Sequence, residues 1–410
     1  MQLTHKIALR PTKEQKEYFQ KAAGTARFVW NWALAEWNRQ FSLGLKPHAL
    51  LLKKQFNQIK YQEFPWLKEM HRDSHAQPFA YLQKGWQRFF KDLEAKKPAY
   101  EPKVKKKGRC RDSFYVANDK FRIQGNDVYL PKIGRVPLTE ALRFEGKILG
   151  ATVSRTANRW FIAVQVEVSE ATARKRRSSN GIIGIDLGIT AAVTLSDGKK
   201  IASPRPLKSA LRRLKIRGRR ASHKLSMARE QIGLSRTAPI PKGTRLPKSH
   251  NHKKCSLKLA KLHARIVHLR EDFTHKVTNK LCRENQTIVL EDLHVKGMLA
   301  NHKLSLAIND VGFGAIRQKI EYKAKRFATK VIIADRFYPS SRLCSGCGWY
   351  FKELSLSERN WQCSSCQTWH DRDVNAALNL KRLATITALP VANHLAIKDT
   401  TLRKVLNVVG

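Results

Sequence analysis

The chain has 410 residues, and its 79 lysines and arginines outnumber 32 acidic residues, giving a formal net charge of +47. Such an excess would make the protein repel itself unless a polyanion neutralised it, which predicts extended contact with nucleic acid. A membrane surface is the alternative partner, but we find no secretory signal and no apolar run of about 18 residues. The hydrophobic fraction of 42% excludes wholesale disorder, and the length favours two to four domains. We expect a cytoplasmic protein with no membrane partner.

A strand and a long helical block open the chain. Apolar and polar residues alternate from Met1 to Leu9, which is the period of a strand, and Pro11-Thr12 begins a helix. The helical pattern continues to about Phe90 and is dense in aromatic residues, most of which we expect in a core. The same helical stretch carries side chains of the types that contact bases and phosphates, namely Tyr81, Gln83, Lys84 and Arg88.

A basic run from Lys96 to Arg111 follows the helical block. This run is either a solvated linker or a strap that contacts a nucleic-acid backbone, for example through Lys105 and Lys106. Alternating runs between residues 113 and 168 are separated by turn residues, and they predict an antiparallel barrel or sandwich. We expect the first strand to belong to this sheet structure, with the helical block inserted between its first and second strands.

A new domain is expected from Gly181, after the basic linker Arg174–Arg177. Residues 182–185 are rich in isoleucine and predict a buried strand that ends at Asp186. The neighbouring glycines allow a ligand or another backbone to approach closely. Taken alone, Asp186 is equally well explained as a turn residue, because Ala191–Leu195 has the pattern of a hairpin partner.

Two later segments also place carboxylates at the ends of regular elements. The apolar run Thr287–Leu290 ends in Glu291-Asp292, and Asp371-Arg372-Asp373 opens a helical segment rich in alanine and leucine. Mg²⁺ prefers oxygen ligands, and a pair of such ions can assist the displacement of a phosphodiester. Three carboxylates of this kind therefore favour a metal site over a simple turn at Asp186.

A long helical excursion lies between the first two acidic strands. Lys208–Met227 carries eight basic residues and is expected to follow a nucleic-acid backbone rather than fill a core. Residues 234–248 are rich in Pro, Gly and Thr and predict a mobile loop. Apolar residues from Leu259 to Leu281 recur every three or four positions, which predicts an amphipathic helix on the sheet. A helix over 309–327 and a strand over 330–334 should follow. Within Lys208–Met227, the candidates for nucleic-acid contact are Arg212, Arg213, Arg219 and Arg220.

Four of the seven cysteines form two C-x-x-C pairs with 15 residues between them. The pairs are Cys344 with Cys347 and Cys363 with Cys366. This spacing predicts a closed tetrahedral thiolate site for structural Zn²⁺ on a small β ribbon, in a reducing compartment. A redox dithiol is the alternative, but it would not need two pairs.

The remaining candidates have simpler explanations. Cys110, Cys255 and Cys282 are isolated in sequence and are treated as ordinary thiols. His370 is expected to be a surface residue, with orientation of the neighbouring acid as the alternative. Residues 385–410 have a weak pattern, for which partial disorder is expected.

Five motifs occur in this chain order: Arg27-Phe28-Val29-Trp30-Asn31, Gly184-Ile185-Asp186-Leu187-Gly188, Leu290-Glu291-Asp292-Leu293, Tyr338-Pro339-Ser340-Ser341 and Asp371-Arg372-Asp373-Val374-Asn375-Ala376-Ala377. Together they resemble the TnpB family of transposon-encoded RNA-guided endonucleases, which is similar to the compact type V CRISPR effectors.

The resemblance implies an α/β multidomain protein. An RNase-H-like RuvC nuclease domain would contain an inserted zinc ribbon, and an N-terminal wedge β-barrel would carry an inserted helical recognition domain. The implied boundaries are 1–10 and 112–172 for the wedge, 11–111 for the recognition domain, 181–340 and 367–384 for the nuclease domain, 341–366 for the ribbon and 385–410 for a C-terminal tail.

The resemblance also implies the site residues. Asp186, Glu291 and Asp373 would be the catalytic Mg²⁺ ligands. Asp373 is preferred to Asp371 because the family's acid stands two residues before an asparagine, here Asn375.

The implied partners are a guide RNA and a target double-stranded DNA with its displaced strand, with one protein chain per RNA. The implied reaction is Mg²⁺-dependent hydrolysis that leaves a 5′-phosphate, after a short adjacent DNA motif has been read. Tyr81, Gln83 and Lys84 are the candidate readers. The alternatives are a nuclease-inactive RNA-guided repressor, which an intact acid triad disfavours, and a strand-joining transposase, which the resemblance disfavours.

Overall fold

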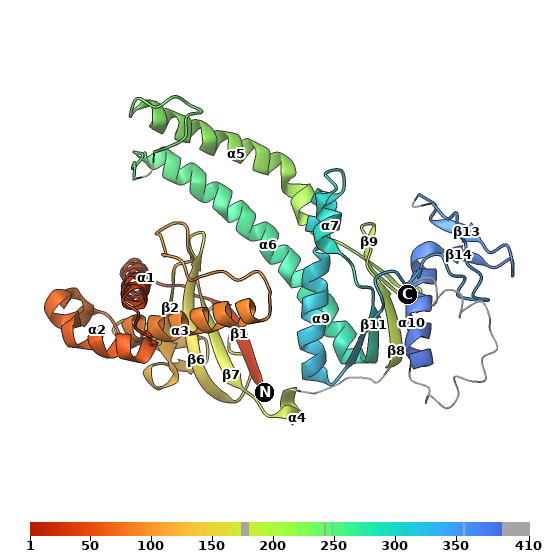
Figure 1. The fold of residues 1–410 in the computed structure, drawn as a ribbon, viewed down its shortest axis with the longest axis horizontal. Coiled ribbons are helices and arrows are strands. Elements are labelled where there is room, and N and C mark those ends of the chain that lie inside the picture. Colours follow the sequence, from red (N-terminus) through yellow and green to blue (C-terminus); the bar gives the residue numbers. More distant parts are fainter. Residues whose placement is uncertain (174–179, 242, 248, 356, 388–410) are drawn as a thin grey trace. The chain divides into compact units, whose positions relative to one another are not determined.

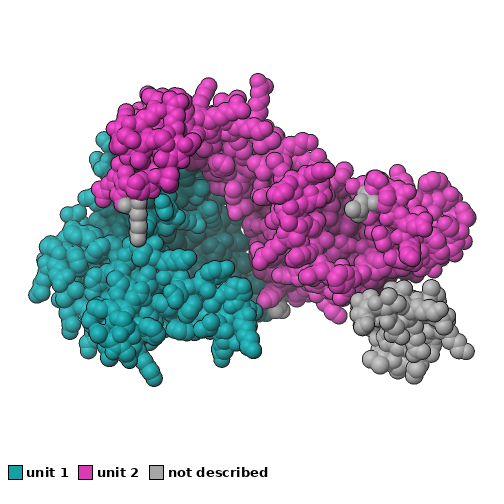
Figure 2. Space-filling model, turned by 45° about the horizontal axis from the view of Figure 1, so that its top comes forward, with its two compact units in different colours: residues 1–172 teal, residues 173–410 magenta. Residues whose placement is uncertain are grey.

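The computed structural model describes residues 1–173, 180–241, 243–247, 249–355 and 357–387. The chain forms two compact units, Met1–Thr172 and Ala173–Gly410 (Figures 1 and 2), and each is described by itself. Among the described residues, no helix combines the length and the apolar character needed to cross a membrane.

Unit 1 contains two antiparallel sheets. The four-stranded sheet has the order β1-β7-β6-β2, so β1 and β2 are its edges. The second sheet has the order β3-β4-β5, and a bridge between Leu9 and Leu138 connects the two. The bounds are β1 Gln2–Ala8, β2 Ser113–Ala117, β3 Arg122–Gln124, β4 Asp127–Leu130, β5 Gly134–Pro137, β6 Lys147–Thr156 and β7 Arg159–Glu167, with a short 3₁₀ turn at Asn118–Lys120 and a short helix α4 at Glu170–Ala173. The prediction that the first strand joins these later strands is confirmed.

The predicted helical block lies between β1 and β2, and it consists of three helices. They are α1 (Lys13–Ser42), α2 (Ala49–Glu63) and α3 (Arg72–Glu94), with a 3₁₀ turn at Pro65–Glu69. A capping box fixes the start of α1, because Gln15 N donates to Thr12 Oγ1 and Thr12 N donates to Gln15 Oε1. Most aromatic side chains of this helical block are buried or half-buried, as expected, but Phe41, Tyr61, Trp66, Tyr81 and Phe90 are exposed.

The basic strap, residues 103–111, is fastened to α1 by two residues of the first family motif. Trp30 Nε1 donates to the Lys103 carbonyl oxygen at 3.1 Å. The Asn31 side chain accepts from Lys105 N at 2.8 Å and donates to Lys105 O at 2.9 Å. These bonds hold the strap against the helix instead of leaving it as a free linker.

Unit 2 is built on a five-stranded mixed sheet of order β10-β9-β8-β11-β12. The β8–β9 hairpin is antiparallel, whereas β11 runs parallel to both β8 and β12. The bounds are β8 Asn180–Asp186, β9 Ala191–Leu195, β10 Lys200–Ala202, β11 Asn285–Leu290 and β12 Lys330–Ile333. The two acidic strands predicted from the sequence are therefore neighbours, and both end at the same edge of the sheet.

Helices cover both faces of this sheet (Figure 1). One core includes side chains of β8, β11, α6 (His250–Glu284), α8 (Ser305–Val311) and α9 (Phe313–Phe327). A separate core on the other face includes Val289 of β11 and Leu380 of α10 (Arg372–Thr387). The prediction of one helix over 309–327 is wrong, because Gly312 has a φ of 77° and separates α8 from α9.

A long helical hairpin extends from the sheet of unit 2 (Figure 1). The hairpin consists of α5 (Pro206–Glu230) and α6. A separate short helix, α7 (Val295–Ala300), follows β11. The apolar stripe predicted for α6 is largely buried, but Leu269 is 45% exposed. Within the predicted loop 234–248, the described residues contain no helix or strand.

The ribbon contains a two-stranded hairpin of β13 (Asn360–Gln362) and β14 (Trp369–Asp371), with the first cysteine pair before β13 and the second pair between the two strands. β14 lies after the second pair, so the ribbon hairpin extends past residue 366. The predicted basic linker Arg174–Arg177, and the predicted tail beyond residue 387, lie outside the described residues.

Candidate functional site

The three predicted catalytic carboxylates come from three elements of unit 2. Asp186 is the last residue of β8, Glu291 directly follows β11, and Asp373 lies in the first turn of α10. Because β8 and β11 are adjacent and parallel, their carboxyl ends place Asp186 and Glu291 near each other.

Gly184 explains how α10 reaches this edge of the sheet. A Cβ atom added at Gly184 would lie 1.9 Å from the carbonyl oxygen of Ala377 and 2.6 Å from the backbone nitrogen of Lys381. The α10 backbone therefore packs directly on β8, at a distance that only glycine permits. The close approach of another backbone was one of the two roles predicted for the glycines around Asp186.

The electrostatics of the carboxylates report their proximity. Burial raises the pKa of Asp186 well above its usual range, and repulsion from Glu291 and then from Asp373 raises the pKa further. Burial also raises the pKa of Glu291, against a hydrogen bond from Ser340 and the charge of Arg372. The structure thus brings the three residues close enough to interact electrostatically, although their carboxylate oxygens do not all lie within 4.8 Å of one another. A cation beside them would reduce the repulsion.

The carboxylates adjacent in sequence have different partners. Asp292 is paired with Arg317 and with Arg336, and these hydrogen bonds lower its pKa. Asp371 accepts from the backbone nitrogens of Asp373 and Val374, at 3.1 and 3.0 Å, and caps α10. These ion pairs and cap bonds give Asp292 and Asp371 structural roles.

Asp371 also accepts a hydrogen bond from Lys200 Nζ at 2.6 Å. Burial acts to raise the pKa of Asp371, but this bond and the two backbone donors lower it overall. The carboxylate is therefore held in its charged form, as a residue that caps a helix and pairs with a lysine.

A hydroxyl group orients Glu291. Ser340 Oγ donates to the Glu291 carboxylate, and Ser340 is itself buried. The Asn379 side chain donates to Ser340 O at 2.8 Å and to Leu343 O at 2.7 Å. Ser340 belongs to the Tyr338–Ser341 family motif, but no pattern in the sequence predicts its contact with Glu291.

Two arginines lie close to the acidic group. Arg359 Nη1 is 3.6 Å from Asp373 Oδ1. Burial lowers the pKa of Arg372, as does repulsion from Arg359 and Arg342, while Asp373 and Asp186 act in the opposite direction. Positive charge thus lies beside the carboxylates, on two arginines that no pattern in the sequence identifies as part of the site.

The four predicted zinc cysteines form a compact cluster. They are the one group of three or more His, Cys, Asp or Glu residues in the described ranges whose ligand atoms all lie within 4.8 Å of one another. The Sγ atoms of Cys344 and Cys366 are 3.6 Å apart, as are those of Cys347 and Cys363. A tetrahedral zinc site with bonds of about 2.3 Å has sulfur–sulfur edges of about 3.8 Å, so the cluster has the dimensions of such a site.

The prediction that His370 is a surface residue is wrong. His370 is 7% exposed and its Nε2 lies 3.0 Å from Cys344 Sγ. Its ring also packs against Trp361, its cross-strand partner in the β13–β14 hairpin. Pairing with β13 turns the side chain towards the cluster, which a three-residue strand does not reveal in the sequence.

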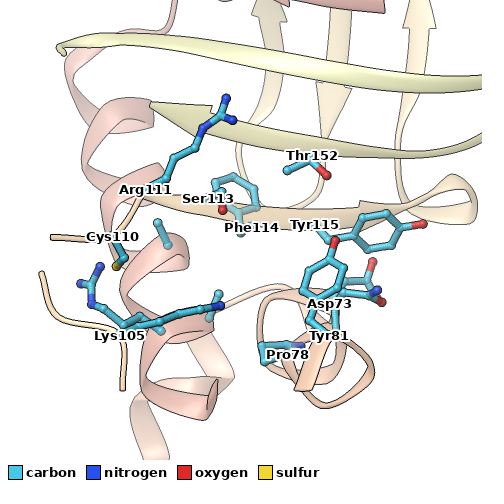
Figure 3. A pocket seen from close by; sticks show the side chains of 14 residues that line it. Asp73, Pro78, Tyr81, Lys105, Cys110, Arg111, Ser113, Phe114, Tyr115 and Thr152 are labelled. Atoms are coloured by element: carbon cyan, nitrogen blue, oxygen red, sulfur yellow. The ribbon is translucent and has the colours of Figure 1, made fainter. Parts of the chain in front are cut away.

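Three of the four candidate nucleic-acid contacts on α3 lie along two neighbouring cavities that share Asp73, Gln77 and Tyr115 in their linings. Tyr81 lines a small cavity of about 50 Å³ beside Asp73 and Tyr115 (Figure 3). Gln83 and Lys84 line a different, open cavity of about 810 Å³, and Gln83 Oε1 also accepts from Ala49 N at the start of α2. Arg88, 3.5 Å from Asp92, is among the residues of neither cavity.

The basic candidates differ in exposure. Lys105 Nζ lies 3.6 Å from the centroid of the Trp30 ring, and burial lowers the pKa of Lys105. Lys106 is exposed, as are the four arginines predicted on α5. Those four are Arg212, Arg213, Arg219 and Arg220.

Three family models match parts of the chain. Residues 313–380 match the Cas12f1-like TNB domain, residues 242–302 match a model described as a probable transposase, and residues 1–46 match a model described as a helix-turn-helix domain. In this structure, residues 1–46 form β1 and the single long helix α1. The helix-turn-helix description therefore does not fit the observed elements.

Two curated relatives span nearly the whole chain. A Streptomyces pristinaespiralis protein is 34% identical over 386 residues, covering 92% of this chain and 87% of that protein. InsQ of Escherichia coli K12 is 30% identical over 393 residues, covering 92% of this chain and 90% of InsQ. Both names provisionally assign RNA-guided DNA endonuclease activity.

The chain belongs to the TnpB family. A solved Cas12f1–sgRNA–target DNA complex has the same overall fold, with a TM-score of 0.51 and 13% identity over 90% of this chain and 83% of that one. The expected relation between this TnpB-family chain and type V effectors is confirmed, and so is a mixed α/β fold.

Proposed function

We propose that this TnpB-family protein is an RNA-guided, Mg²⁺-dependent DNA endonuclease with a RuvC-like active site. The observation that carries the proposal is the convergence of Asp186, Glu291 and Asp373, from distant segments, into one interacting acidic group. The provisional names of the two long relatives support the same activity. Asp292 and Asp371 have structural partners, which leaves the predicted three as the catalytic set.

The donor chemistry of the acidic group fits Mg²⁺. All three side chains offer carboxylate oxygens. Burial and then repulsion from Glu291 and Asp373 raise the pKa of Asp186, and bound cations would relieve that repulsion. When bound, a pair of Mg²⁺ ions supplies charge that activates water and stabilises the leaving oxygen of a phosphodiester. Asp186, Glu291 and Asp373 would hold these ions.

The chain's own residues prepare the site for this chemistry. β8 and the close packing at Gly184 fix Asp186 and the first turn of α10 against each other. Ser340 orients the Glu291 carboxylate through its hydroxyl. Arg359 and Arg372 reduce the repulsion among the acids and offer guanidinium groups to a DNA phosphate.

The cysteine cluster fits a structural Zn²⁺. Its four thiols leave no open coordination position for a reacting group, so its contribution is stability. Burial raises the pKa of Cys344 to about 12 and also raises that of Cys363, whereas hydrogen bonding with Thr368 lowers the pKa of Cys366 to about 6. A bound metal would therefore displace protons from the buried thiols.

The charge of the chain supports RNA and DNA as partners. A net charge of +47 suits a protein that holds a guide RNA and a target duplex mainly through backbone contacts, because base pairing then selects the sequence. The domain boundaries implied by the family resemblance belong to the same proposal, with the wedge and recognition domains in unit 1 and the nuclease domain and zinc ribbon in unit 2. The repressor alternative is disfavoured because all three acids are present.

The proposal is tested by purifying the protein with its native transcript and exposing the complex to a plasmid library with randomised flanks, with and without Mg²⁺. Asp186→Ala should keep the RNA and lose cleavage, by at least about 100-fold given the site's role in charge stabilisation. Asp197→Ala is the matched control, because Asp197 lies in the turn after β9 and contacts only Lys199 among the described residues. Cleavage by the Asp186 variant, or a wild-type complex that binds its target without cutting, would contradict the proposal.

A further inference from the structure

A groove of about 360 Å³ opens beside the acidic group. Its lining residues come from two segments, 291–293 and 335–342, together with Tyr350 and Arg372. Glu291 belongs both to this groove and to the acidic group, so the groove begins where the proposed chemistry takes place.

An aromatic side chain projects from the groove wall. Phe337 is 75% exposed, although its backbone is firmly held, because Phe337 N donates to Asp335 Oδ1 at 2.8 Å. The next residue, Tyr338, donates its backbone N–H to Asp335 O at 3.1 Å and packs on the core beneath α10. A hydrogen-bonded turn thus presents an exposed aromatic side chain, and Tyr350, which is 38% exposed, lines the same groove.

The groove also contains positive charge without a carboxylate partner. Arg336 is paired with Asp292 and is largely neutralised. Arg342 has no carboxylate within 4.0 Å in the described part of the chain, and its guanidinium contacts the Tyr350 hydroxyl at 3.4 Å. Since Arg342 and Arg372 repel each other, an anionic group placed between them would be favourable.

We propose that this groove binds one unpaired nucleotide of the DNA strand being cut, with its base stacked on Phe337 and its phosphate held by Arg342. Stacking on an aromatic side chain beside a cationic backbone contact is a common mode of single-strand binding. A base inside a duplex has both faces covered by its neighbours, so the groove selects an unstacked strand. The proposal rests on the proposed function, because Glu291 connects the groove to the site of cutting.

The first test measures stacking without requiring cleavage. The Asp186→Ala protein, complexed with its own guide RNA, is mixed with a short single-stranded oligonucleotide that carries one 2-aminopurine. We expect quenching of the probe that persists in a Phe337→Tyr variant and is lost with Phe337→Ala. Trp369→Ala is the matched control, because Trp369 is 69% exposed and is not among the residues that line the groove. Quenching that survives Phe337→Ala would overturn the proposal.

The second test uses cleavage in the wild-type background. After the cut position is mapped, an abasic nucleotide is moved through the neighbouring positions of the cut strand. At one position the abasic nucleotide should slow cleavage by the wild type by about 5- to 150-fold, which is the effect expected for one stacked base. The Phe337→Ala variant should cleave this abasic substrate no more slowly than it cleaves the intact substrate. If the abasic nucleotide slows the Phe337→Ala variant by the same factor as the wild type, the two effects are independent and the proposal is contradicted.

Arg342 gives an independent measurement. Arg342→Ala should reduce the slope of log affinity against log salt by about 0.7 for the single-stranded probe, and Arg342→Lys should restore it. If the wild type never cuts but quenching depends on Phe337, the proposed endonuclease function is wrong, whereas binding of an unpaired nucleotide in the groove is supported. If the wild type cuts and quenching does not depend on Phe337, the proposed nucleotide binding in the groove is wrong, whereas the proposed endonuclease function is supported.

Discussion

The side-chain amide of Asn379 donates a hydrogen bond of 2.8 Å to the carbonyl oxygen of Ser340. Asn379 also donates to Leu343 O, and Asn375, one turn earlier, donates to the same carbonyl and accepts from Ser345 N. Two buried asparagines of α10 therefore hold the loop that carries Ser340 at one end and the first zinc cysteine at the other. The hydrogen bond from Ser340 to Glu291 makes this loop a physical connection between the cysteine cluster and the acidic group.

Removing Asn379 should weaken both ends of that connection. Asn379→Ala removes two hydrogen bonds, but both carbonyl oxygens keep a bond from Asn375. The two lost bonds should lower the free energy of unfolding by about 1–3 kcal/mol in total and Tm by on the order of 2–12 °C. Cleavage should fall as well, because Ser340 no longer has a fixed position beneath Glu291. Thermal unfolding and single-turnover cleavage check the two effects, with Asn251→Ala on the exposed face of α6 as control. Unchanged cleavage in the Asn379 variant would show that Ser340 keeps its position unaided.

Gly184 offers a test of how α10 is positioned. Gly184→Ala would put a methyl group where the Ala377 carbonyl oxygen now lies, so α10 must shift away from β8. Asp373 would then move relative to Asp186, and we expect a loss of cleavage of at least about tenfold together with a lower Tm.

Gly181→Ala is the matched control for this prediction. Gly181 lies in the same strand, and a Cβ atom added there meets nothing within 4 Å. The control should retain wild-type cleavage and stability. Equal losses in both variants would mean that strand propensity, and not the approach of α10, causes the effect.

Much of this site is readable from local sequence, because its residues end elements with strong periodicity. Asp186 and Glu291 terminate runs of β-branched residues, and the cysteine spacing alone predicts the thiolate cluster. The sequence does not separate Asp371 from Asp373 on physical grounds, since both begin the same helix. The distinction depends on which of them caps the helix and meets Lys200, which is tertiary information.

The errors also have physical causes. The apolar pattern continues from Val311 to Phe313 across Gly312, and an isolated glycine is tolerated in helices. The apolar periodicity therefore does not predict the break between α8 and α9. Leu269 continues the stripe of α6 and nevertheless remains half exposed. His370 is buried only through cross-strand pairing with Trp361.

The cysteine cluster predicts a defined metal content. Cys344→Ser opens a four-thiolate site, so zinc per chain should fall well below the single equivalent expected for the wild type, and Tm should drop. Cys255→Ser is the control, because Cys255 lies on α6 outside the cluster. Elemental analysis of purified protein measures the zinc. A full zinc equivalent in the Cys344 variant would indicate that another residue, with His370 the nearest candidate, completes the site.

Lys323 gives a prediction for pH. Lys323 is 6% exposed, and its ammonium group donates to His275 O at 2.6 Å and to Thr278 Oγ1 at 2.8 Å. Burial lowers the pKa of Lys323 to about 8, whereas an unfolded lysine titrates near about 10.4. Between these values the unfolded state binds a proton that the folded state does not, so the contribution of Lys323 to stability rises with pH. Below about pH 8 both states carry the charge, and the cost of burying it is fully present.

Replacing this lysine should therefore change the pH dependence of unfolding. Lys323→Met removes the buried charge, and its Tm relative to the wild type should be highest below pH 8 and should decline as the pH approaches 10. The difference in pKa corresponds to at most about 3 kcal/mol across this window. Lys325→Met on the exposed face of the same helix is the control and should follow the wild type throughout. Thermal unfolding at pH 7, 8, 9 and 10 measures the difference. Parallel curves for the Lys323 variant and the wild type would mean that the Lys323 amine has the same pKa in the folded and unfolded chains.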